Sequence, residues 1–441
     1  MTEEVGIFNR LRRKSMKKVH IMGMGGSGAS AIAAIAKSQG FEVSGCDLQP
    51  INEFTTDLGI AVLTGHSSEH LTDKDILAIT PAIIKFDPGN EEVREAKKQG
   101  IEILTWQEFM GKYLEKDKFV IAISGTHGKS TTTAMIGTLL EDAELDPTVE
   151  LGAVVNKWGK NFRVGNSKYF VTEADEYNNN FLVSHPDITV VLNIDYDHPD
   201  FFKTLDSYKE AFYNFILQSK GTVVANLEDK NVSEVLKNVM KHSKVSSVDF
   251  NKNEVNLNLQ IPGKHYLFDA KAAFQVGVIL GIEPQKIIYS LNNFQGIGRR
   301  LEKIGQVNEA IVISSFGHHP TEIEADIEAL KEKYSDKKLW VIFQPHLFSR
   351  TKLLFNDFVR MFKNLNVAGV MIAPIYPSRE KDPGDINSKM LAQKIGDKKV
   401  EYVEDVVKFY PEMRKMLTKN DLVLFIGAGD TDKWAREFVN D

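Results

Sequence analysis

Twice in this chain an apolar strand runs through a glycine turn directly into a helix of small or apolar residues. The first unit begins at Val19 and reads VHIMG, MGGSG and ASAIAAIAKSQG, and a second strand, FEVSGCD, follows it. The other begins at Phe119 and reads FVIAISG, THGKS and TTTAMIGTLLEDA. Such units are typical of parallel sheets, and the turn places backbone amides at a helix N-terminus, where anions bind. The sequence therefore predicts an α/β fold with two phosphate-binding turns.

The length of the chain and the order of its strand patterns predict three domains. A chain of 441 residues is longer than one hydrophobic core usually serves. We expect a Rossmann-like N-terminal domain over residues 1–117 and a central domain over 118–297 with a parallel sheet of the P-loop ATPase type. A C-terminal Rossmann-like α/β domain would cover residues 298–441.

Composition excludes several classes of protein. No apolar run approaches the roughly 18 residues of a membrane span. The net charge of -6 provides no basic surface for nucleic acid. The single cysteine, Cys46, excludes an internal disulfide framework and a cysteine-only metal cage, and favours a buried thiol in a reducing cytoplasm. We expect a cytoplasmic protein that binds small anionic ligands and neither membranes nor nucleic acid. We expect it to be a monomer or a homodimer.

The second turn, ISGTHGKST, has the residues of a phosphate-binding loop. Lys129 would reach the outer phosphates, and Ser130 would ligate Mg²⁺. The general P-loop needs a glycine where Ile123 stands, so this loop is a shortened variant. A strand before it and a helix after it favour phosphate binding over a plain turn.

Two further side chains end apolar strands and predict a metal site near the loop. Glu173 closes YFVTE, and His198 follows VLNIDYD. Because strand ends of a parallel sheet point toward the same crevice, both would lie near Ser130, where oxygen ligands suit Mg²⁺. Taken alone, His198 could equally be a solvated loop residue, and the pair Asp175 and Glu176 has the pattern of a solvated turn.

The first glycine turn contains the GxGxxG pattern of a pyrophosphate-binding turn. Gly23, Gly25 and Gly28 follow a strand, and Asp47 ends the next strand about twenty residues later. The pattern alone suggests NAD, but a UDP-sugar carries a pyrophosphate as well. An NAD-dependent oxidoreductase would leave the second loop unexplained, and a simple ATPase or kinase would leave the first turn unexplained.

The loop SGTHGKSTTT resembles the signature of the Mur ligase family, whose members assemble peptidoglycan precursors. Further motifs of that family follow in order: EADEY at Glu173, NIDYDH at Asn193, PGKH at Pro262, GRRLE at Gly298, GHHPTEI at Gly317 and QPHLFSRT at Gln344. The stretches HIMGMGGSGASAIA and GCDL are similar to members that add L-alanine to UDP-N-acetylmuramate. The resemblance implies ATP-dependent ligation through an acyl phosphate, with ATP as co-substrate and Mg²⁺ as cofactor.

The resemblance also implies a role for each matching residue. The residues that match Glu173 and His198 are magnesium ligands in the family, with Ser130 beside them. The implied contacts to ATP are Gly125, Thr126, His127, Gly128, Lys129, Ser130, Thr131 and Arg300. Those to the UDP-sugar are Gly23, Gly25, Gly26, Ser27, Gly28, Asp47 and His66.

The implied catalytic residues are Lys129, His198, His318, His319 and Arg350. Lys129 would neutralise the transferring phosphoryl group, and His198 with its ion would hold the acceptor carboxylate. Arg350 and His346 would hold the incoming amino acid. One of the two adjacent histidines would help to deprotonate the amine, since imidazole titrates near neutrality.

Several positions depart from the family pattern. Leu347 stands where an arginine usually follows QPH, and Ser315 and Phe316 replace an aspartate and a tyrosine. Tyr266 and Asp269 replace two asparagines that lie by the adenine. These changes leave the acceptor open between L-alanine, glycine, L-serine and a murein tripeptide. A non-catalytic sensor of UDP-sugar or ATP is the alternative of a different class.

Overall fold

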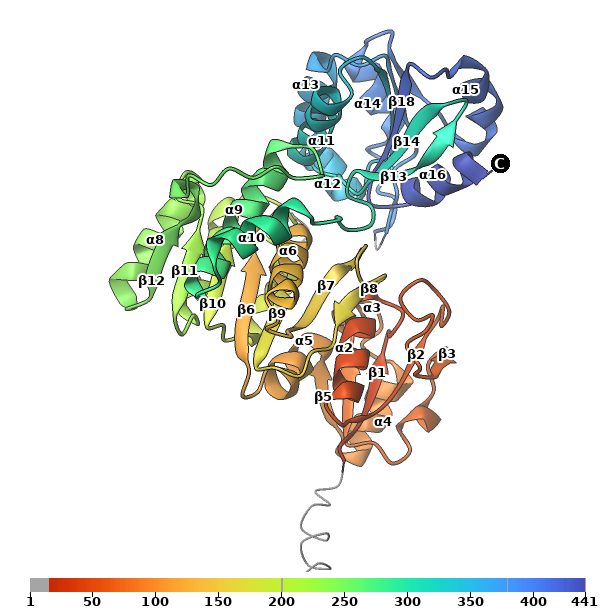
Figure 1. Cartoon of the computed structure of the whole chain (residues 1–441). Coiled ribbons are helices and arrows are strands. Elements are labelled where there is room, and N and C mark those ends of the chain that lie inside the picture. The colour runs from red at the N-terminus through yellow and green to blue at the C-terminus, as the bar shows by residue number, and fades with distance from the viewer. Residues whose placement is uncertain (1–15, 200, 379, 441) are drawn as a thin grey trace, which may run out of the picture.

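The computed structural model describes residues 16–199, 201–378 and 380–440, which form three α/β domains built on three separate sheets (Figure 1). The predicted three-domain α/β architecture is confirmed. The domain boundaries remain predictions, and residues 1–15 of the expected first domain lie outside the described part. Among the described residues, no helix combines the length and apolar character that a bilayer crossing requires.

The N-terminal domain is a parallel sheet with strand order β3-β2-β1-β4-β5. Its strands are β1 (Lys18–Met22), β2 (Glu42–Asp47), β3 (Val62–Thr64), β4 (Ile76–Ile79) and β5 (Glu102–Thr105). Its helices are α2 (Ser27–Ser38), η1 (Ser68–Leu71), α3 (Pro81–Phe86), α4 (Glu91–Gln99), α5 (Trp106–Phe109) and η2 (Met110–Leu114). Helix α4 begins where the Asn90 side chain accepts from the Glu92 amide at 2.9 Å, and ends at Gly100 with φ +72°.

The central domain has the strand order β12-β11-β10-β6-β9-β7-β8, and only the edge strand β8 is antiparallel to its neighbour. Its strands are β6 (Phe119–Ser124), β7 (Thr148–Val155), β8 (Lys160–Arg163), β9 (Tyr169–Glu173), β10 (Ile188–Val191), β11 (Thr222–Ala225) and β12 (Ser246–Asp249). Its helices are α6 (Lys129–Asp142), η3 (Tyr177–Val183), α7 (Leu205–Leu217), α8 (Lys230–His242), η4 (Phe250–Lys252), α9 (Lys264–Ile279) and α10 (Pro284–Asn292). Because β6 lies between β9 and β10, the ends of these strands place the loop, Glu173 and Asn193 at one edge.

The C-terminal domain has the strand order β13-β14-β18-β15-β16-β17, with β13 antiparallel at one edge. Its strands are β13 (Glu302–Val307), β14 (Ala310–Ser315), β15 (Lys338–Phe343), β16 (Gly369–Ile372), β17 (Val400–Tyr402) and β18 (Asp421–Ile426). Its helices are α11 (Pro320–Lys333), α12 (Phe348–Leu353), α13 (Phe355–Asn364), α14 (Ser388–Ile395), η5 (Val407–Phe409), α15 (Tyr410–Met416) and α16 (Thr431–Asn440).

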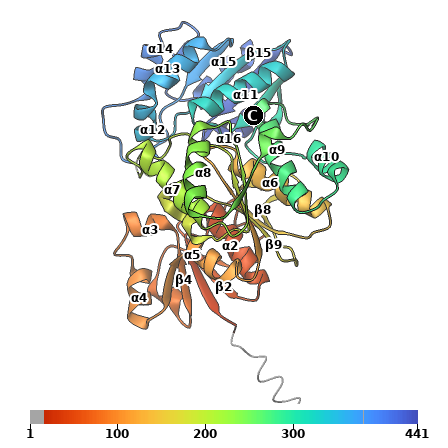
Figure 2. The same cartoon turned by 90° about the vertical axis from the view of Figure 1, so that its left-hand side faces the viewer.

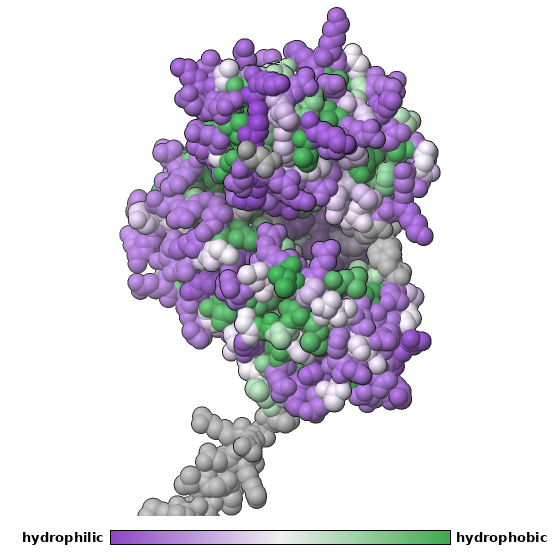
Figure 3. All heavy atoms as spheres, turned by 90° about the vertical axis from the view of Figure 1, so that its right-hand side faces the viewer, coloured by the Kyte–Doolittle hydropathy of each residue, from purple (hydrophilic) through white to green (hydrophobic). Residues whose placement is uncertain are grey.

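The central domain lies between the other two in both ribbon views (Figures 1 and 2). It shares a continuous apolar cluster with the N-terminal domain, which runs from Ile32 through Phe109 to Phe170. Helix α2 packs against β7 and β8 at this interface. A hydrophilic recess separates the C-terminal domain from the two domains below it (Figure 3). The N-terminal and central domains are therefore joined by a core, whereas the C-terminal domain faces a polar cleft.

Gly45 gives a test of the close approach of β2 to β1. A Cβ on Gly45 would lie 2.6 Å from the Ile21 carbonyl oxygen and 2.6 Å from Met24 Cε. We expect Gly45→Ala to lower the free energy of unfolding by about 1–3 kcal/mol, the usual cost of overpacking, in urea denaturation. Gly89→Ala is the control, since nothing lies within 4 Å of its Cβ position. Equal effects of the two substitutions would contradict the packing described for β2.

Candidate functional site

The phosphate loop between β6 and α6 is held in shape by the end of β10. Gly125 has φ +143° and Gly128 has φ +86°, conformations that side-chain-bearing residues rarely adopt. The Thr126 amide donates to the Asn193 carbonyl at 3.2 Å, and the His127 amide donates to Asn193 Oδ1 at 2.8 Å. The loop therefore presents the N-terminus of α6, where the helix dipole favours an anion.

Lys129 folds back over this loop. Its Nζ donates to the Gly125 carbonyl at 2.6 Å and to Glu176 Oε2 at 2.9 Å. Burial lowers the pKa of Lys129, but the nearby carboxylates, Glu176 foremost, outweigh burial and raise the pKa overall. The amine is therefore a fixed cation beside the helix N-terminus, as a group that binds outer phosphates requires.

Glu176 is fully buried and joins Lys129 to His198. Its Oε1 accepts from the Tyr208 hydroxyl at 2.9 Å and lies 3.4 Å from His198 Nε2. Burial raises the pKa of Glu176, but Lys129 and His198 outweigh burial and hold the pKa at about 2. The expectation that Asp175 and Glu176 form a solvated turn is wrong for Glu176, because η3 follows β9 at once and turns this side chain inward.

Two groups of potential metal ligands flank Lys129. Ser130 Oγ donates to Glu173 Oε2 at 2.8 Å, so this predicted pair does meet. His198 lies in the other group, with ligand atoms of Asp175 and Glu176 within 4.8 Å of one another. His198 Nδ1 is buried and has no hydrogen-bond partner among the described residues. The predicted ligands therefore lie on both sides of the lysine rather than in one cluster.

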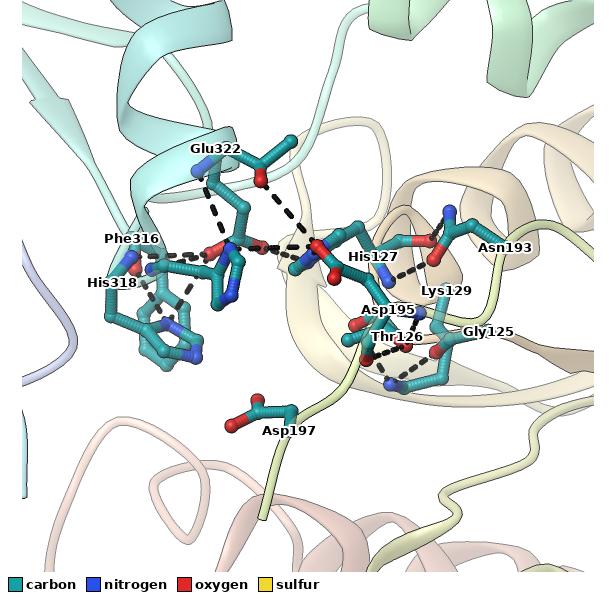
Figure 4. A network of polar contacts seen from close by, with 12 residues as sticks. Gly125, Thr126, His127, Lys129, Asn193, Asp195, Asp197, Phe316, His318 and Glu322 are labelled. Carbon is teal, nitrogen blue, oxygen red and sulfur yellow. Dashed lines mark hydrogen bonds and ion pairs between the residues drawn. The ribbon is translucent and has the colours of Figure 1, made fainter. Parts of the chain in front are cut away.

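A second network joins the loop to the C-terminal domain through His127 (Figure 4). His127 Nε2 lies 3.3 Å from Asp195 Oδ2, and its Nδ1 lies 3.3 Å from Glu322 Oε1. Glu322, in α11, also lies 3.5 Å from Arg300 Nη1. Burial lowers the pKa of His127, but the two carboxylates outweigh burial and raise the pKa to about 9. Sequence reasoning missed Asp195 and Glu322, although both lie within motifs that it identified.

Arg350 bridges the central and C-terminal domains. Its Nε and Nη2 each lie 3.1 Å from a carboxylate oxygen of Asp197, and its Nη1 lies 3.1 Å from His346 Nδ1. The His346 ring stacks on Tyr376 with centroids 5.7 Å apart. Burial raises the pKa of Asp197, but Arg350 outweighs burial and holds the pKa well below its ordinary value. The structure thus brings together Arg350 and His346 as expected, at a domain junction.

The two adjacent histidines both have a lowered pKa; His319 is buried, and the side chain of His318 is 17% exposed. His318 Nδ1 lies 3.2 Å from the Phe316 carbonyl, and burial, with a smaller effect of Arg350, lowers the pKa of His318 to about 3. Burial and His127 lower the pKa of His319, whose ring centroid is 5.0 Å from that of His127. His319 Nε2 has no hydrogen-bond partner among the described residues. His319 Nδ1 accepts from the Thr321 amide at 3.3 Å, so its ring proton lies on Nε2. His318 Nδ1 faces the Phe316 carbonyl, which leaves His318 a lone pair on Nε2 at neutral pH.

Three residues near α12 and β14 differ from the family pattern, and the structure gives each of them a defined environment. Leu347 is buried with φ +69°, at the start of α12. The Ser315 hydroxyl donates to Asp326 at 2.5 Å and so belongs to the C-terminal core. The Phe316 ring lies 4.8 Å from Arg299 and 5.2 Å from Arg300, within cation–π range. Phe316 therefore supports the arginines by its ring face.

Tyr266 and Asp269 line a cavity of about 100 Å³ beside Gly128. Tyr266 packs into the apolar core of the C-terminal domain, although it belongs to α9 of the central domain. Burial raises the pKa of Asp269 to about 7. The cavity lies between α9 and α11, next to the phosphate loop.

The glycine turn of the N-terminal domain is fixed by β2. The amides of Gly23 and Met24 donate to the Cys46 carbonyl at 2.9 and 3.0 Å, and the Gly25 amide donates to Asp47 Oδ2 at 2.9 Å. Asp47 therefore shapes the turn itself. The other predicted residues of this turn, Gly26, Ser27 and Gly28, lead into α2, and Asn161 of β8 donates to the Ser27 carbonyl.

His66, predicted to lie near the uridine, contacts Cys46 Sγ at 3.3 Å and is 16% exposed. A larger cleft of about 330 Å³ is lined by all three domains, through Glu53, Ser130, Gly152, Arg299 and Arg436.

Three α/β domains with a glycine-rich strand-to-helix loop in the central one have the architecture of a multidomain α/β enzyme. The Mur ligase family, catalytic domain, matches residues 18–118; the Mur ligase middle domain matches 123–279, and the Mur ligase, glutamate ligase domain, matches 299–429. The chain belongs to the Mur ligase family.

Named relatives and a solved structure agree with this membership. The chain is 39% identical to a UDP-N-acetylmuramate--L-alanine ligase of Caldicellulosiruptor saccharolyticus, covering 95% of this chain and 97% of the relative. It is 37% identical to the ligase of the same name from Acetivibrio thermocellus, covering 96% of each. The UDP-N-acetylmuramate-alanine ligase structure from Thermotoga maritima is 27% identical, with a TM-score of 0.78 over 96% of this chain and 98% of that one.

The His127 contacts give a test by pH. Since the pKa of His127 rises from about 6.5 to about 9 on folding, its contribution to stability is complete below pH 6.5 and is lost as pH rises through 9. Between pH 7 and pH 10, we expect the thermal midpoint of the wild-type chain to decrease. This decrease should exceed that of the His127→Gln variant by about 2–4 °C.

His185→Gln serves as the control, because His185 is exposed and is not a member of the network. It should retain the full pH dependence. A His127→Gln variant with that same dependence would disprove the role of the Asp195 and Glu322 contacts.

Proposed function

We propose that the chain ligates L-alanine to the carboxylate of UDP-N-acetylmuramate at the expense of ATP, in the cytoplasmic synthesis of peptidoglycan precursors. The observation that carries the proposal is the position of Lys129 on a phosphate loop, beside two groups of potential metal ligands. The next residue, Ser130, lines a cleft that all three domains share. Relatives that share over a third of its residues along nearly the whole chain carry the name of this activity.

ATP would bind with its phosphates on the loop. The proposed contacts are Gly125, Thr126, His127, Gly128, Lys129, Ser130, Thr131 and Arg300. Its adenine would enter the cavity beside Gly128, where Tyr266 and Asp269 replace the usual amides. When phosphate oxygens approach Lys129, they would compete with Glu176 for the same amine.

The residues present fit a magnesium ion. Ser130 and Glu173 supply a hydroxyl and a carboxylate in direct contact, and His198 has a buried nitrogen without a partner among the described residues. We propose Ser130 and Glu173 as ligands of one Mg²⁺ ion and His198 as a ligand of a second ion. When bound, the ions supply positive charge that neutralises the transferring phosphoryl group.

The UDP-sugar would bind to the N-terminal domain and extend into the three-domain cleft. Its diphosphate would lie on the glycine turn, at Gly23, Gly25, Gly26, Ser27 and Gly28, which Asp47 shapes. His66 contacts Cys46 of β2, and this contact places His66 beside the turn. The acceptor carboxylate would then approach the γ-phosphate near Lys129.

The carboxylate would attack the γ-phosphate to give an acyl phosphate and ADP, and the amine would then displace phosphate. Arg350 and His346 would hold the carboxylate of the amino acid through the Nη1 edge, since Asp197 takes the other two nitrogens. His318, whose Nε2 has a lone pair at neutral pH, would accept the proton of the amine, whereas His319 carries its ring proton on Nε2.

Leu347 provides no charge for the amino acid. Loss of one charge-assisted contact costs about 1.5–3 kcal/mol, which weakens amino-acid binding without removing phosphate chemistry. If Leu347 changes the preference for the amino acid, the acceptor in place of L-alanine would be glycine, L-serine or a murein tripeptide. A second candidate function, a sensor that binds UDP-sugar or ATP without turnover, is favoured only by Tyr266 and Asp269 in the cavity beside the loop.

An assay of phosphate release tests the function directly. With ATP and Mg²⁺, we expect release to require both UDP-N-acetylmuramate and L-alanine, each being omitted in turn. Glycine, L-serine and the murein tripeptide are tested in parallel. Faster phosphate release with one of them than with L-alanine would identify that compound as the acceptor. Tight binding of the UDP-sugar with no release in any combination would support the sensor instead.

Lys129→Ala tests the placement of the phosphoryl group. We expect kcat to fall by about a hundredfold to a thousandfold, since one fixed charge is lost at the transferring group. UDP-sugar binding, measured by calorimetry, should remain. Lys230→Ala is the matched control on an exposed helix start. Wild-type turnover in Lys129→Ala would contradict the proposed role.

A further inference from the structure

Four potential metal ligands meet on the face of the N-terminal sheet that carries α4. They are His20 of β1, Cys46 of β2, His70 of η1 and Glu92 of α4, and their ligand atoms all lie within 4.8 Å of one another. Glu92 is central: its carboxylate oxygens lie 3.3 Å from Cys46 Sγ, 2.8 Å from His70 Nδ1 and 3.7 Å from His20 Nε2. None of these side chains has a part in the proposed ligation.

The cluster is buried, and one of its atoms lacks a partner. The side chains of His20 and Glu92 are fully buried, as is Cys46. His20 Nε2 has no hydrogen-bond partner among the described residues, although it is aimed at Glu92. A buried imidazole nitrogen without a partner is costly, and a bound cation would satisfy it. This nitrogen points to a ligand independently of the composition of the cluster.

The surroundings of His20 orient it for coordination. Its Nδ1 lies 2.9 Å from Ser44 Oγ, so the hydroxyl can accept the ring proton and leave the Nε2 lone pair facing the cluster. Glu92 is fixed in the same way by the Ser67 amide, which donates to it at 2.9 Å. Second-shell contacts of this kind set the orientation of metal ligands in known sites.

The donor set and its spacing suit zinc. Tetrahedral Zn²⁺ with bonds of about 2.0 Å to nitrogen or oxygen and 2.3 Å to sulfur separates neighbouring ligand atoms by about 3.3–3.5 Å. The separations from Glu92 to His70, Cys46 and His20, 2.8, 3.3 and 3.7 Å, bracket that spacing, so shifts of about half an ångström would bring the ligand atoms to it. A thiolate with two imidazoles favours zinc over magnesium or calcium, which prefer oxygen ligands.

We propose that His20, Cys46, His70 and Glu92 form a structural zinc site in the N-terminal domain. Four protein ligands close the coordination sphere, which is typical of structural rather than catalytic zinc. On binding, the Cys46 thiol releases its proton to solvent and its sulfur bonds the ion. His66 and His70 are 16% and 14% exposed and mark the side by which the ion enters. Because the Cys46 carbonyl holds the amides of Gly23 and Met24, the ion would brace the nearby glycine turn.

Cobalt is the probe that isolates this site from the nucleotide site. Cys46 is the single cysteine of the chain, so a thiolate-to-cobalt charge-transfer band in the near ultraviolet reports Cys46 alone. We expect the full-length chain, stripped by a chelator, to develop this band with one equivalent of Co²⁺. One equivalent of Zn²⁺ should abolish the band, whereas excess Mg²⁺ should not.

Variants separate coordination from folding. Cys46→Ser should lose the band, and His70→Asn should weaken Co²⁺ and Zn²⁺ binding by tenfold or more, measured by competition with a chromophoric chelator. His185→Asn, an exposed histidine outside the cluster, is the matched control and should bind as the wild type does. Circular dichroism checks that each variant is folded, and His70, at the edge of the cluster, keeps the test valid if Cys46→Ser unfolds.

Two results would overturn the proposal. One is a folded wild-type chain without the charge-transfer band at stoichiometric Co²⁺. The other is a band that His70→Asn and Glu92→Gln leave unchanged in affinity, which would make the cluster a hydrogen-bonded core only. Phosphate release in the assay described above does not enter either result, so this test is independent of the proposed ligation.

Discussion

The buried ion pair of Lys129 with Glu176 organises the centre of the molecule. Glu176 is fully buried, and its charge is matched by Lys129, His198 and the Tyr208 hydroxyl. A buried charge of this kind is costly unless it is paired, so the loop, η3 and α7 are tied to one arrangement. The same pairing keeps a cation at the N-terminus of α6.

The two domain interfaces have different chemistry. Apolar side chains join the N-terminal and central domains into one core, from Ile32 to Phe170. The C-terminal domain packs Tyr266 of α9 into its own core, but around the phosphate loop it meets the central domain through charged pairs, chiefly His127 with Glu322 and Asp197 with Arg350. Replacing charged contacts by contacts to the charges of a bound nucleotide requires little free energy, whereas exposing an apolar core to water requires much more. Movement on ligand binding is therefore expected at the C-terminal domain.

Local patterns predicted the fold and much of the site, because short stretches of neighbouring residues determine strand–turn–helix units and the positions of strand ends. The phosphate loop and the Ser130–Glu173 contact follow from such patterns, whereas the Arg350–His346 pair follows from the resemblance of QPHLFSRT to the family motif. Contacts between distant segments were missed: nothing next to Glu176 in the sequence indicates burial by Tyr208, and nothing next to Glu322 indicates His127. The edge strands β7 and β8 were also missed, and the roles assigned to the site residues remain predictions.

We propose that the carboxylate of UDP-N-acetylmuramate becomes an acyl phosphate at Lys129 before the amine attacks. Transfer of oxygen from that carboxylate to phosphate measures this step directly. With the carboxylate labelled with ¹⁸O, ATP and L-alanine, the account predicts that each phosphate released carries one ¹⁸O atom, detected by ³¹P NMR or mass spectrometry. Unlabelled phosphate, released at the rate of amide formation, would contradict the account.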